Sequence, residues 1–248
     1  MRFKSPVAGW ILALILLSAP SALADKAHPV VLELFTSQGC SSCPPADQVL
    51  GQFADKEDVV ALSFHVDYWD YIGWKDTFAS KQTTARQHRY AQAMAQRHVY
   101  TPQLVVGGQK HIVGSDLRAV QAAVSQARKS LVMSGNGSEY QPSVNVEGAG
   151  KGLKINVSSL PGIPCEAWLF AVDRRHEVAV RRGENSGQKL VYSNVVRAVK
   201  LLGSWDGGDQ KFTVSGEDMT AGKPDGYVII VQAKGQGPVL AAAQHWLD

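Results

Sequence analysis

Charge imbalance and cysteine are both scarce in this sequence, and each shortage excludes a class of function. The 25 basic and 22 acidic residues leave a formal net charge of +3, too close to neutral to favour nucleic acid as a partner. Only three cysteines occur, which is too few for a four-cysteine zinc site. The sequence also lacks GxGxxG and P-loop patterns, so nothing in it supports a nucleotide cofactor.

What is present is an ordinary globular composition. Hydrophobic residues make up 45% of the chain and charged residues 19%, with 23 glycines and 11 prolines. These values exclude collagen-like, low-complexity and fully disordered chains. The length of 248 residues favours one or two domains, each large enough to bury a hydrophobic core.

Residues 1–24 are typical of a secretory signal peptide. Arg2 and Lys4 precede the apolar run 7–17, and a small-x-small cleavage site ends at Ala24. The apolar run is about half of the ~20 residues that span a bilayer, so an uncleaved anchor is the less favoured alternative. Cleavage after Ala24 predicts a periplasmic or secreted protein without stable membrane insertion, in an oxidising compartment where disulfides persist.

Residues 25–133 are predicted to form one domain of alternating strands and helices. Apolar runs of strand length occupy residues 30–35 and 59–66, and helical patterns occupy residues 44–54, 76–98 and about 116–131. A hairpin with a Gly107-Gly108 turn is expected between the last two helices. Alternation of this kind is typical of an α/β domain.

Residues 134–248 have a different pattern and are predicted to form a second domain. Short alternating runs are separated by glycine, proline, asparagine and aspartate, which predicts an antiparallel sandwich-like or partly barrel-like β domain. Strands are expected near residues 167–172, 178–182 and 190–202, among others. The glycine- and serine-rich segment 134–138 is the candidate linker.

The chemistry is expected at Cys40-Ser41-Ser42-Cys43, between the first predicted strand and the first predicted helix. Unpaired N–H groups and a partial positive charge at a helix N-terminus stabilise a thiolate and make such a cysteine nucleophilic. Pro44-Pro45 fits the opening turn of a helix. The motif therefore favours a redox-active pair, with a purely structural disulfide and a metal site as the alternatives.

Pro102 supplies the second signal, because it directly precedes a predicted strand in the run Tyr100–Val106. A proline in this place is a candidate cis proline, which would free the preceding backbone groups to pair with an extended thiol substrate. The alternative is a trans proline that merely starts the strand.

The order of these elements resembles the thioredoxin fold, and residues 35–40 resemble the loop before the cysteines of a glutaredoxin. A longer set of motifs resembles a secreted bacterial family of unassigned function, with a thioredoxin-like N-terminal domain and a β-rich C-terminal extension. These motifs are FTSQGCSSCPPAD at 35–47, HVDYWDYIGWKD at 65–76, RQHRY at 86–90, YTPQLVVGG at 100–108, RRGENSGQKL at 181–190 and NVVRAVKLLGSWDGG at 194–208.

The resemblance implies an α/β thioredoxin-like domain followed by an all-β sandwich-like domain. It also implies a thiol–disulfide role, in which Cys40 is the attacking thiol and Cys43 the resolving one, with Thr101-Pro102 as the cis-proline element. Thioredoxin-like proteins often keep a buried acid beneath the disulfide, and Glu33 is the candidate for that acid. A buried carboxyl there would exchange a proton with Cys43, whereas a glutamate at a strand edge would simply face solvent.

Four further features allow two interpretations each. The aromatic segment 65–74 forms either a substrate groove near the disulfide or a hydrophobic lid over the core. The helical face of Arg86, Gln87 and Tyr90 either supports the tryptophan-rich loop or, as we favour, forms a solvated or interdomain hydrogen-bonding face. The charged loop 181–187 is either a plain turn or an interdomain contact. Cys165 is either a buried small hydrophobe, the favoured interpretation, or a reactive thiol.

The leading hypothesis is an exported thiol–disulfide oxidoreductase that acts on protein thiols or disulfides through Cys40 and Cys43. Another exported protein is the expected substrate or redox partner. The dithiol serves as its own cofactor, and no metal site is predicted. Two alternatives stay open: a non-enzymatic binding protein in which the Cys40–Cys43 disulfide is structural, and a carrier that binds copper or zinc through its thiolates.

Overall fold

The structure is a computed structural model that describes residues 28–135, 141–149, 152–216 and 223–247. The predicted signal peptide at residues 1–24 and most of the predicted linker lie outside the described residues. Within these ranges, no helix is both long and apolar enough to cross a membrane.

The first half of the chain contains the three α-helices of the described ranges. Its elements are β1 (Val30–Thr36), α1 (Pro44–Gly51), β2 (Val59–His65), the short 3-10 helix η1 (Asp70–Ile72), α2 (Lys81–Ala93), β3 (Gln103–Val106), β4 (Lys110–Val113) and α3 (Leu117–Gly135). The predicted strands, the hairpin and the first and last helices are confirmed. The helix expected from residue 76 begins instead at Lys81, because the Ser80 hydroxyl caps it by accepting from the Thr83 N–H at 3.1 Å.

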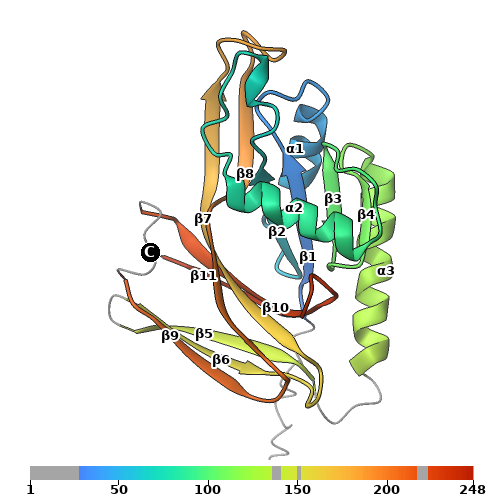
Figure 1. Ribbon diagram of the computed structural model, residues 1–248, viewed down its shortest axis with the longest axis vertical. Helices are drawn as coiled ribbons and strands as arrows, with labels where there is room; N and C mark the ends of the chain where they lie inside the picture. The colour runs from blue at the N-terminus through green and yellow to red at the C-terminus, as the bar shows by residue number, and fades with distance from the viewer. Residues whose placement is uncertain (1–27, 136–140, 150–151, 217–222, 248) are drawn as a thin grey trace, which may run out of the picture.

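The second half consists of strands. These are β5 (Ser143–Ala149), β6 (Gly152–Ser158), β7 (Cys165–Ala179), β8 (Lys189–Trp205), β9 (Gln210–Val214), β10 (Gly226–Ala233) and β11 (Val239–Trp246). Strands β7 and β8 are 15 and 17 residues long and pair along their whole length. The short strands expected between residues 167 and 202 are therefore parts of two long ones, which run the length of the molecule (Figure 1).

The fold-class prediction, a thioredoxin-like α/β domain followed by a separate all-β sandwich, is wrong. Strands from both halves of the chain form one mixed eight-stranded sheet, in the order β11-β10-β7-β8-β2-β1-β3-β4 (Figure 1). Strands β5, β6 and β9 form a second, three-stranded sheet. Among the described residues, eleven strands stand against three α-helices, so the protein is mostly β there. The division of the chain into residues 25–133 and 134–248 stays a prediction.

The two halves of the large sheet join where β8 runs parallel to β2. Ser63 pairs with Val195, and the Asn194 side chain donates to the Ala61 carbonyl at 3.0 Å. This junction covers an edge of β2 that would otherwise present unpaired backbone groups. Periodicity in the sequence predicts that a strand exists but not which distant strand lies beside it, so the continuous sheet was not foreseen.

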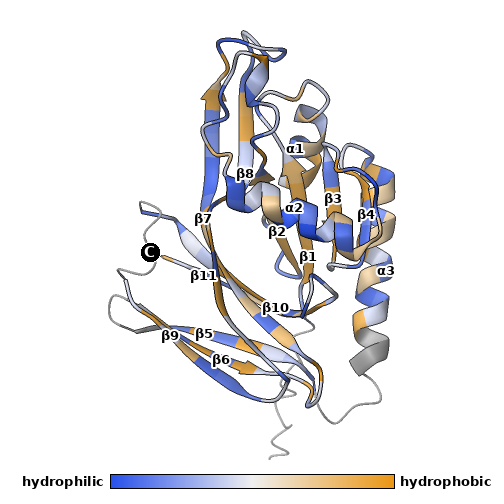
Figure 2. Ribbon diagram, in the orientation of Figure 1, coloured by the Kyte–Doolittle hydropathy of each residue, from blue (hydrophilic) through white to orange (hydrophobic). Residues whose placement is uncertain are grey.

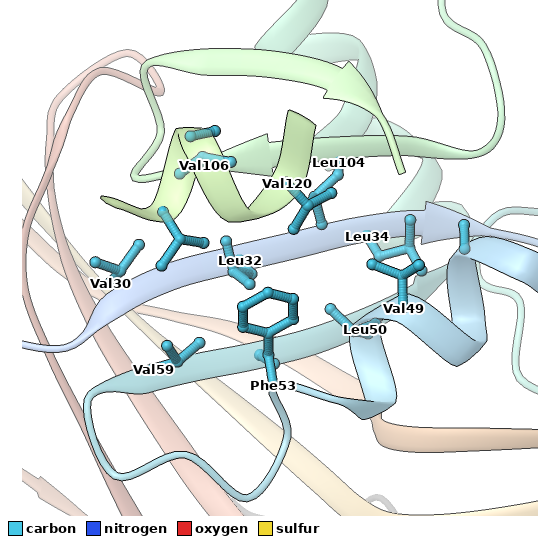
Figure 3. Close-up of a cluster of buried hydrophobic side chains, with 14 residues drawn as sticks. Val30, Leu32, Leu34, Val49, Leu50, Phe53, Val59, Leu104, Val106 and Val120 are labelled. Atoms are coloured by element: carbon cyan, nitrogen blue, oxygen red, sulfur yellow. The ribbon is translucent and has the colours of Figure 1, made fainter. Parts of the chain in front are cut away.

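The two faces of β1 belong to different hydrophobic cores. Leu32 and Leu34 point to the face that α1 and α3 cover, as Figure 3 shows. Val31 and Phe35 point to the other face, where Tyr90 of α2 packs. The strand is apolar along most of its length (Figure 2) because both of its faces are buried. Even-numbered β1 residues therefore face α1, and odd-numbered ones face α2.

The three-stranded sheet packs against β7, β10 and β11 through a third core. Ile155 of β6, Leu169 of β7 and Ile229 of β10 are buried in it. Cys165 lies in the same core and is fully buried, as predicted, and its thiol donates to the Ile163 carbonyl at 3.0 Å. Burial raises the pKa of the Cys165 thiol, which suits a small hydrophobe better than a nucleophile.

Candidate functional site

Cys40 and Cys43 form a disulfide in the turn that opens α1. Their Cα atoms lie 5.4 Å apart, and Cys43 is the N-cap residue immediately before Pro44. The Cys43 carbonyl accepts the N–H of Ala46 at 2.8 Å and that of Asp47 at 3.1 Å. The local sequence explains this placement. The N–H groups of the first helical turn have no partner within the helix, so the two prolines there remove no hydrogen bond that the helix needs.

Thr101 and Pro102 lie beside this disulfide. The Thr101 hydroxyl donates to Cys40 Sγ at 3.3 Å and accepts from Trp69 Nε1 at 2.8 Å. The Thr101–Pro102 peptide bond is cis, which is the first of the two alternatives considered for it. Four of the five predicted site residues are thus brought together, although they come from segments 60 residues apart in the sequence.

The disulfide is closed off from solvent. Both Cys40 and Cys43 have an exposed fraction of 0%, so neither sulfur is open to a substrate in this structure. Ser41 and Ser42 between them are exposed, which places the disulfide directly beneath the surface.

The aromatic segment 65–74 covers part of the cysteine turn. A Cβ atom built on Gly39 would lie 3.1 Å from Ile72 Cδ1 and 3.2 Å from Trp69 Cβ. Such distances are tighter than ordinary contact, so Gly39 allows the segment to approach the cysteine turn closely. This packing favours the lid interpretation of the segment over the groove.

The loop between β7 and β8 covers another part of the cysteine turn. Asn185 is fully buried, and its side-chain amide donates to the carbonyls of Gln38 and Cys40, both at 3.0 Å. The Glu184 carboxylate accepts the Ser41 N–H at 3.3 Å. The charged loop is therefore a contact between the two halves of the chain and not a plain turn. We refer to Trp69, Ile72 and Asn185 together as the cover.

Asp76 ties the aromatic segment to the cysteine turn. Its carboxylate accepts the Gln38 N–H at 2.7 Å and lies 2.7 Å from His65 Nδ1. Burial pushes the pKa of Asp76 upwards, but His65 and the hydrogen bonds outweigh burial and lower that pKa. His65 therefore pairs with Asp76. No group of three His, Cys, Asp or Glu side chains that would hold a metal ion occurs among the described residues.

Glu33, the fifth predicted site residue, is not brought to the disulfide. As an odd-numbered residue of β1 it faces α2, where Arg86 Nε and Nη2 donate to its carboxylate at 2.5 and 2.9 Å. The Tyr90 hydroxyl also donates to this carboxylate. Glu33 is fully buried, so it does not face solvent as the strand-edge alternative would require. Both oxygens of its carboxylate have hydrogen-bond partners.

The helical face of Arg86, Gln87 and Tyr90 is accordingly buried, and it hydrogen-bonds to the second half of the chain. Arg86 is fully buried, and its Nη2 also donates to Gln232 Oε1 of β10 at 3.3 Å. Its guanidinium lies 5.0 Å from the ring centroid of Phe170 of β7. The ion pair therefore links α2 and β1 to the second half of the chain.

Asp47 is a buried acid that the sequence analysis missed. It lies one turn after Cys43 on α1, with an exposed fraction of 5%. Neither of its carboxylate oxygens has a hydrogen-bond partner among the residues that the structure describes. Burial raises the pKa of Asp47 well above its usual value; the nearby Thr36 hydroxyl lowers it partly, and Asp76 raises it further. The signal in the sequence was an acid four residues after Cys43, in helical register.

Buried polar side chains gather on the same face of the sheet as Asp47. Thr36 and Ser63 follow Leu34 and Ala61 by two residues and therefore lie on the face that α1 covers. His65 continues this face, and the ring of Tyr192 from β8 lies 4.6 Å from its ring. We call these residues the polar cluster, which consists of Thr36, Asp47, Ser63, His65 and Tyr192.

The fold and the site define a class of protein with a mixed β-sheet and a CxxC disulfide closed beneath contacts from both halves of the chain. Residues 31–232 match the family described as "Protein of unknown function (DUF1223)". The chain belongs to this family. The match confirms the resemblance to a family of unknown function and confirms nothing beyond that membership.

Solved structures of similar proteins exist. The X-ray crystal structure of a structural genomics target from Agrobacterium tumefaciens is 32% identical in sequence, with a TM-score of 0.75. That match covers 89% of this chain and 95% of the other. HBP35 of Porphyromonas gingivalis is 16% identical, with a TM-score of 0.56 over 90% of this chain and 76% of its own, and is similar in fold alone. No curated protein matches this sequence.

Proposed function

We propose that the protein is an exported thiol–disulfide oxidoreductase whose redox centre is the Cys40–Cys43 pair. The observation that carries the proposal is the 3.3 Å contact from the Thr101 hydroxyl to Cys40 Sγ, at the turn that opens α1. A hydroxyl donor and a helix N-terminus both favour a thiolate over a thiol. The exported location is supported by the leader-like residues 1–24.

The reaction needs only the two cysteines and a substrate disulfide. The Cys40 thiolate attacks one substrate sulfur, and the other leaves as a thiolate, so that a mixed disulfide joins Cys40 to the substrate. The Cys43 thiolate then attacks the Cys40 sulfur and releases the second substrate thiolate. Two electrons pass from the cysteine pair to the substrate, and the Cys40–Cys43 bond forms again. The reverse sequence oxidises a substrate dithiol.

Access to Cys40 requires that the cover move. With both sulfurs buried, a substrate reaches Cys40 only after neighbouring side chains are displaced. We expect Trp69, which donates to Thr101, or Asn185, which donates to the Cys40 carbonyl, to move. The Tyr71 side chain is 80% exposed, and its ring is stacked on that of Trp69 with centroids 6.5 Å apart. A protein substrate that binds Tyr71 therefore contacts the cover directly, and such opening steps commonly limit turnover.

One observation favours a second candidate function, a non-enzymatic protein with a structural disulfide. It is the complete burial of both sulfurs, because catalytic cysteines are ordinarily partly exposed. A disulfide between residues only three apart in sequence closes a very short loop and stabilises the folded chain little by entropy.

Equilibration of the protein with glutathione and dithiothreitol couples distinguishes the two functions. For an oxidoreductase we expect a reduction potential within the range of known catalytic pairs, together with alkylation of Cys40 at a pH below that of an ordinary thiol. A structural disulfide would have a potential below about −300 mV and an ordinary thiol pKa of about 8.5. The second result would overturn the proposal.

Trapping of clients provides the matched mutational test. Cys43→Ser removes the resolving thiol, so mixed disulfides with exported proteins should accumulate and disappear on addition of dithiothreitol. Cys40→Ser is the control, since it keeps one cysteine in the same turn but removes the attacking one. Equal trapping by both variants, or by neither, would contradict the assigned roles.

A further inference from the structure

We propose that Asp47 is the group that exchanges a proton with Cys43 during resolution of the mixed disulfide. This inference rests on the proposed function and deepens it, since it adds to the site a residue of α1 in place of Glu33. It is carried by three observations: the position of Asp47 on the helix, its lack of a partner and the polar cluster around it.

The first observation is that Asp47 and Cys43 occupy neighbouring turns of one helix face. The Asp47 N–H donates to the Cys43 carbonyl at 3.1 Å, so the two residues are in i, i+4 register. Side chains at this spacing are neighbours on a helix surface. The Asp47 side chain therefore lies one helical turn after the Cys43 side chain, on the same face of α1.

The second observation is the contrast between Asp47 and the other buried carboxylates at the sheet. Glu33 is held by Arg86 and Tyr90, and Asp76 is held by His65 and the Gln38 N–H. In the parts of the chain that the structure describes, Asp47 has no such partner for either oxygen. Buried polar groups are nearly always hydrogen-bonded, so a buried acid without a partner requires an explanation other than stability.

The third observation is that the polar cluster beside Asp47 contains several side-chain atoms without a hydrogen-bond partner. Thr36 Oγ1, Ser63 Oγ, His65 Nε2 and Tyr192 Oη are all buried without a partner within the described ranges. Of the titratable groups on neighbouring elements, Asp76 from the loop after β2 and Tyr192 from β8 interact electrostatically with Asp47, and His65 from β2 packs against Tyr192. The hydrogen-bonding capacity of the polar cluster is thus left free beside the carboxyl that would gain and lose a proton.

The proton step completes the resolution reaction. The Asp47 carboxylate takes the proton of the Cys43 thiol, and the resulting thiolate attacks the Cys40 sulfur of the mixed disulfide. The Cys40–substrate bond breaks, the substrate leaves as a thiolate, and the Cys40–Cys43 bond forms. The proton stays on Asp47 until it is lost to solvent or returned to Cys43 in the reverse reaction. Because burial raises the pKa of Asp47, the carboxyl can hold this proton nearer to neutral pH than an exposed aspartate.

The experiment follows the resolution step alone. Reduced protein is mixed with 5,5′-dithiobis(2-nitrobenzoic acid), and release of the second thionitrobenzoate, which Cys43 displaces from Cys40, is timed from pH 5 to pH 9. In Asp47→Asn we expect this release to slow at least tenfold at pH 7, since proton-transfer groups contribute about 10²–10⁴-fold. Its rate should then rise with hydroxide concentration, whereas the wild-type rate levels off. Asp55→Asn, at an exposed acid just after α1, is the matched control and should leave the rate unchanged.

The outcomes separate this inference from the function on which it rests. If the wild type releases the second thionitrobenzoate and Asp47→Asn does so at the same rate and with the same pH profile, the role of Asp47 is overturned and the redox function stands. If the wild type releases none, both are overturned. Carbon-13 NMR of the Asp47 carboxyl in wild-type protein avoids any folding defect of the variant. We expect its titration to differ between oxidised and reduced protein, and identical titrations would overturn the inference.

Discussion

Two buried acids lie on opposite faces of the same region of sheet, and their surroundings differ completely. Glu33 faces α2, where Arg86 and Tyr90 satisfy its carboxylate. Asp47 is a residue of α1 and points to the opposite face of β1. Among the described residues it has no hydrogen-bond partner. Burial alone therefore does not distinguish a structural acid from a reactive one. The distinction lies in whether the carboxylate is already paired, because a paired carboxylate is committed to one charge state.

Arg86→Met should have the largest effect, because it removes the pairing that distinguishes Glu33 from Asp47. This change leaves the Glu33 carboxylate buried with only Tyr90 as a donor, and removing one partner of a buried ion pair costs about 3–5 kcal/mol. We expect urea denaturation to report a loss of this size in the free energy of unfolding. Arg128→Met is the control, because Arg128 pairs with Asp58 at the surface and its loss should cost about 1 kcal/mol or less. Equal losses in the two variants would show that Glu33 and Arg86 do not hold the two halves together.

Asn185→Ala tests the opposite face, where the disulfide lies. It leaves the carbonyls of Gln38 and Cys40 without their donor, which costs about 1–3 kcal/mol. Because Asn185 belongs to the cover, we also expect dithiothreitol to reduce the Cys40–Cys43 disulfide about tenfold faster than in the wild type, a factor that corresponds to about 1.4 kcal/mol. Ser186→Ala, at the exposed neighbouring residue, is the control. A faster reduction in both variants would assign the effect to general loosening of the loop.

Asp47→Asn tests the other acid of the pair through the pH dependence of the free energy of unfolding. The pKa of Asp47 is raised in the folded protein, so its contribution to stability is fully present below the unfolded pKa of about 3.9 and is lost as pH rises through the raised folded value. The variant has no such titration. Its stability relative to the wild type should therefore increase with pH above about pH 4, as followed by urea denaturation at a series of pH values. A constant difference between the two proteins would contradict an elevated pKa.

Local features of this site were predictable from the sequence because they depend on neighbouring residues. The strand before the cysteines, the prolines after Cys43 and the Gly107-Gly108 hairpin are all set by short-range geometry. The two helix caps illustrate the limit of such reasoning. Asp116 caps α3 by accepting the Ala119 N–H at 3.0 Å, and α3 begins where the pattern indicated, whereas α2, capped by the Ser80 hydroxyl, begins five residues later than the pattern indicated.

The rest of the site depends on contacts that no local pattern contains. Asn185 reaches the Cys40 carbonyl across 145 residues of sequence, and β8 reaches β2 in the same way. For Glu33, the sequence correctly indicated an acid inside an apolar strand but not which face of that strand α1 would cover. The alternation of β1 gives two sets of residues, and only the three-dimensional arrangement decides which set meets the disulfide.

Thr101→Val should have the smallest effect. It preserves the shape of the side chain but removes the hydroxyl that contacts Cys40 Sγ, so the free energy of unfolding should fall by about 1 kcal/mol or less. In reduced protein, loss of this donor disfavours the Cys40 thiolate, and iodoacetamide should alkylate Cys40 several-fold more slowly at pH 7, as measured by mass spectrometry of its peptide. Thr213→Val, the same change at an exposed residue of β9, is the control. If both variants are alkylated at the wild-type rate, the Thr101 contact has no part in activating Cys40, and the helix N-terminus and the Ser42 hydroxyl, 3.4 Å from Cys40 Sγ, must account for any reactivity of that sulfur.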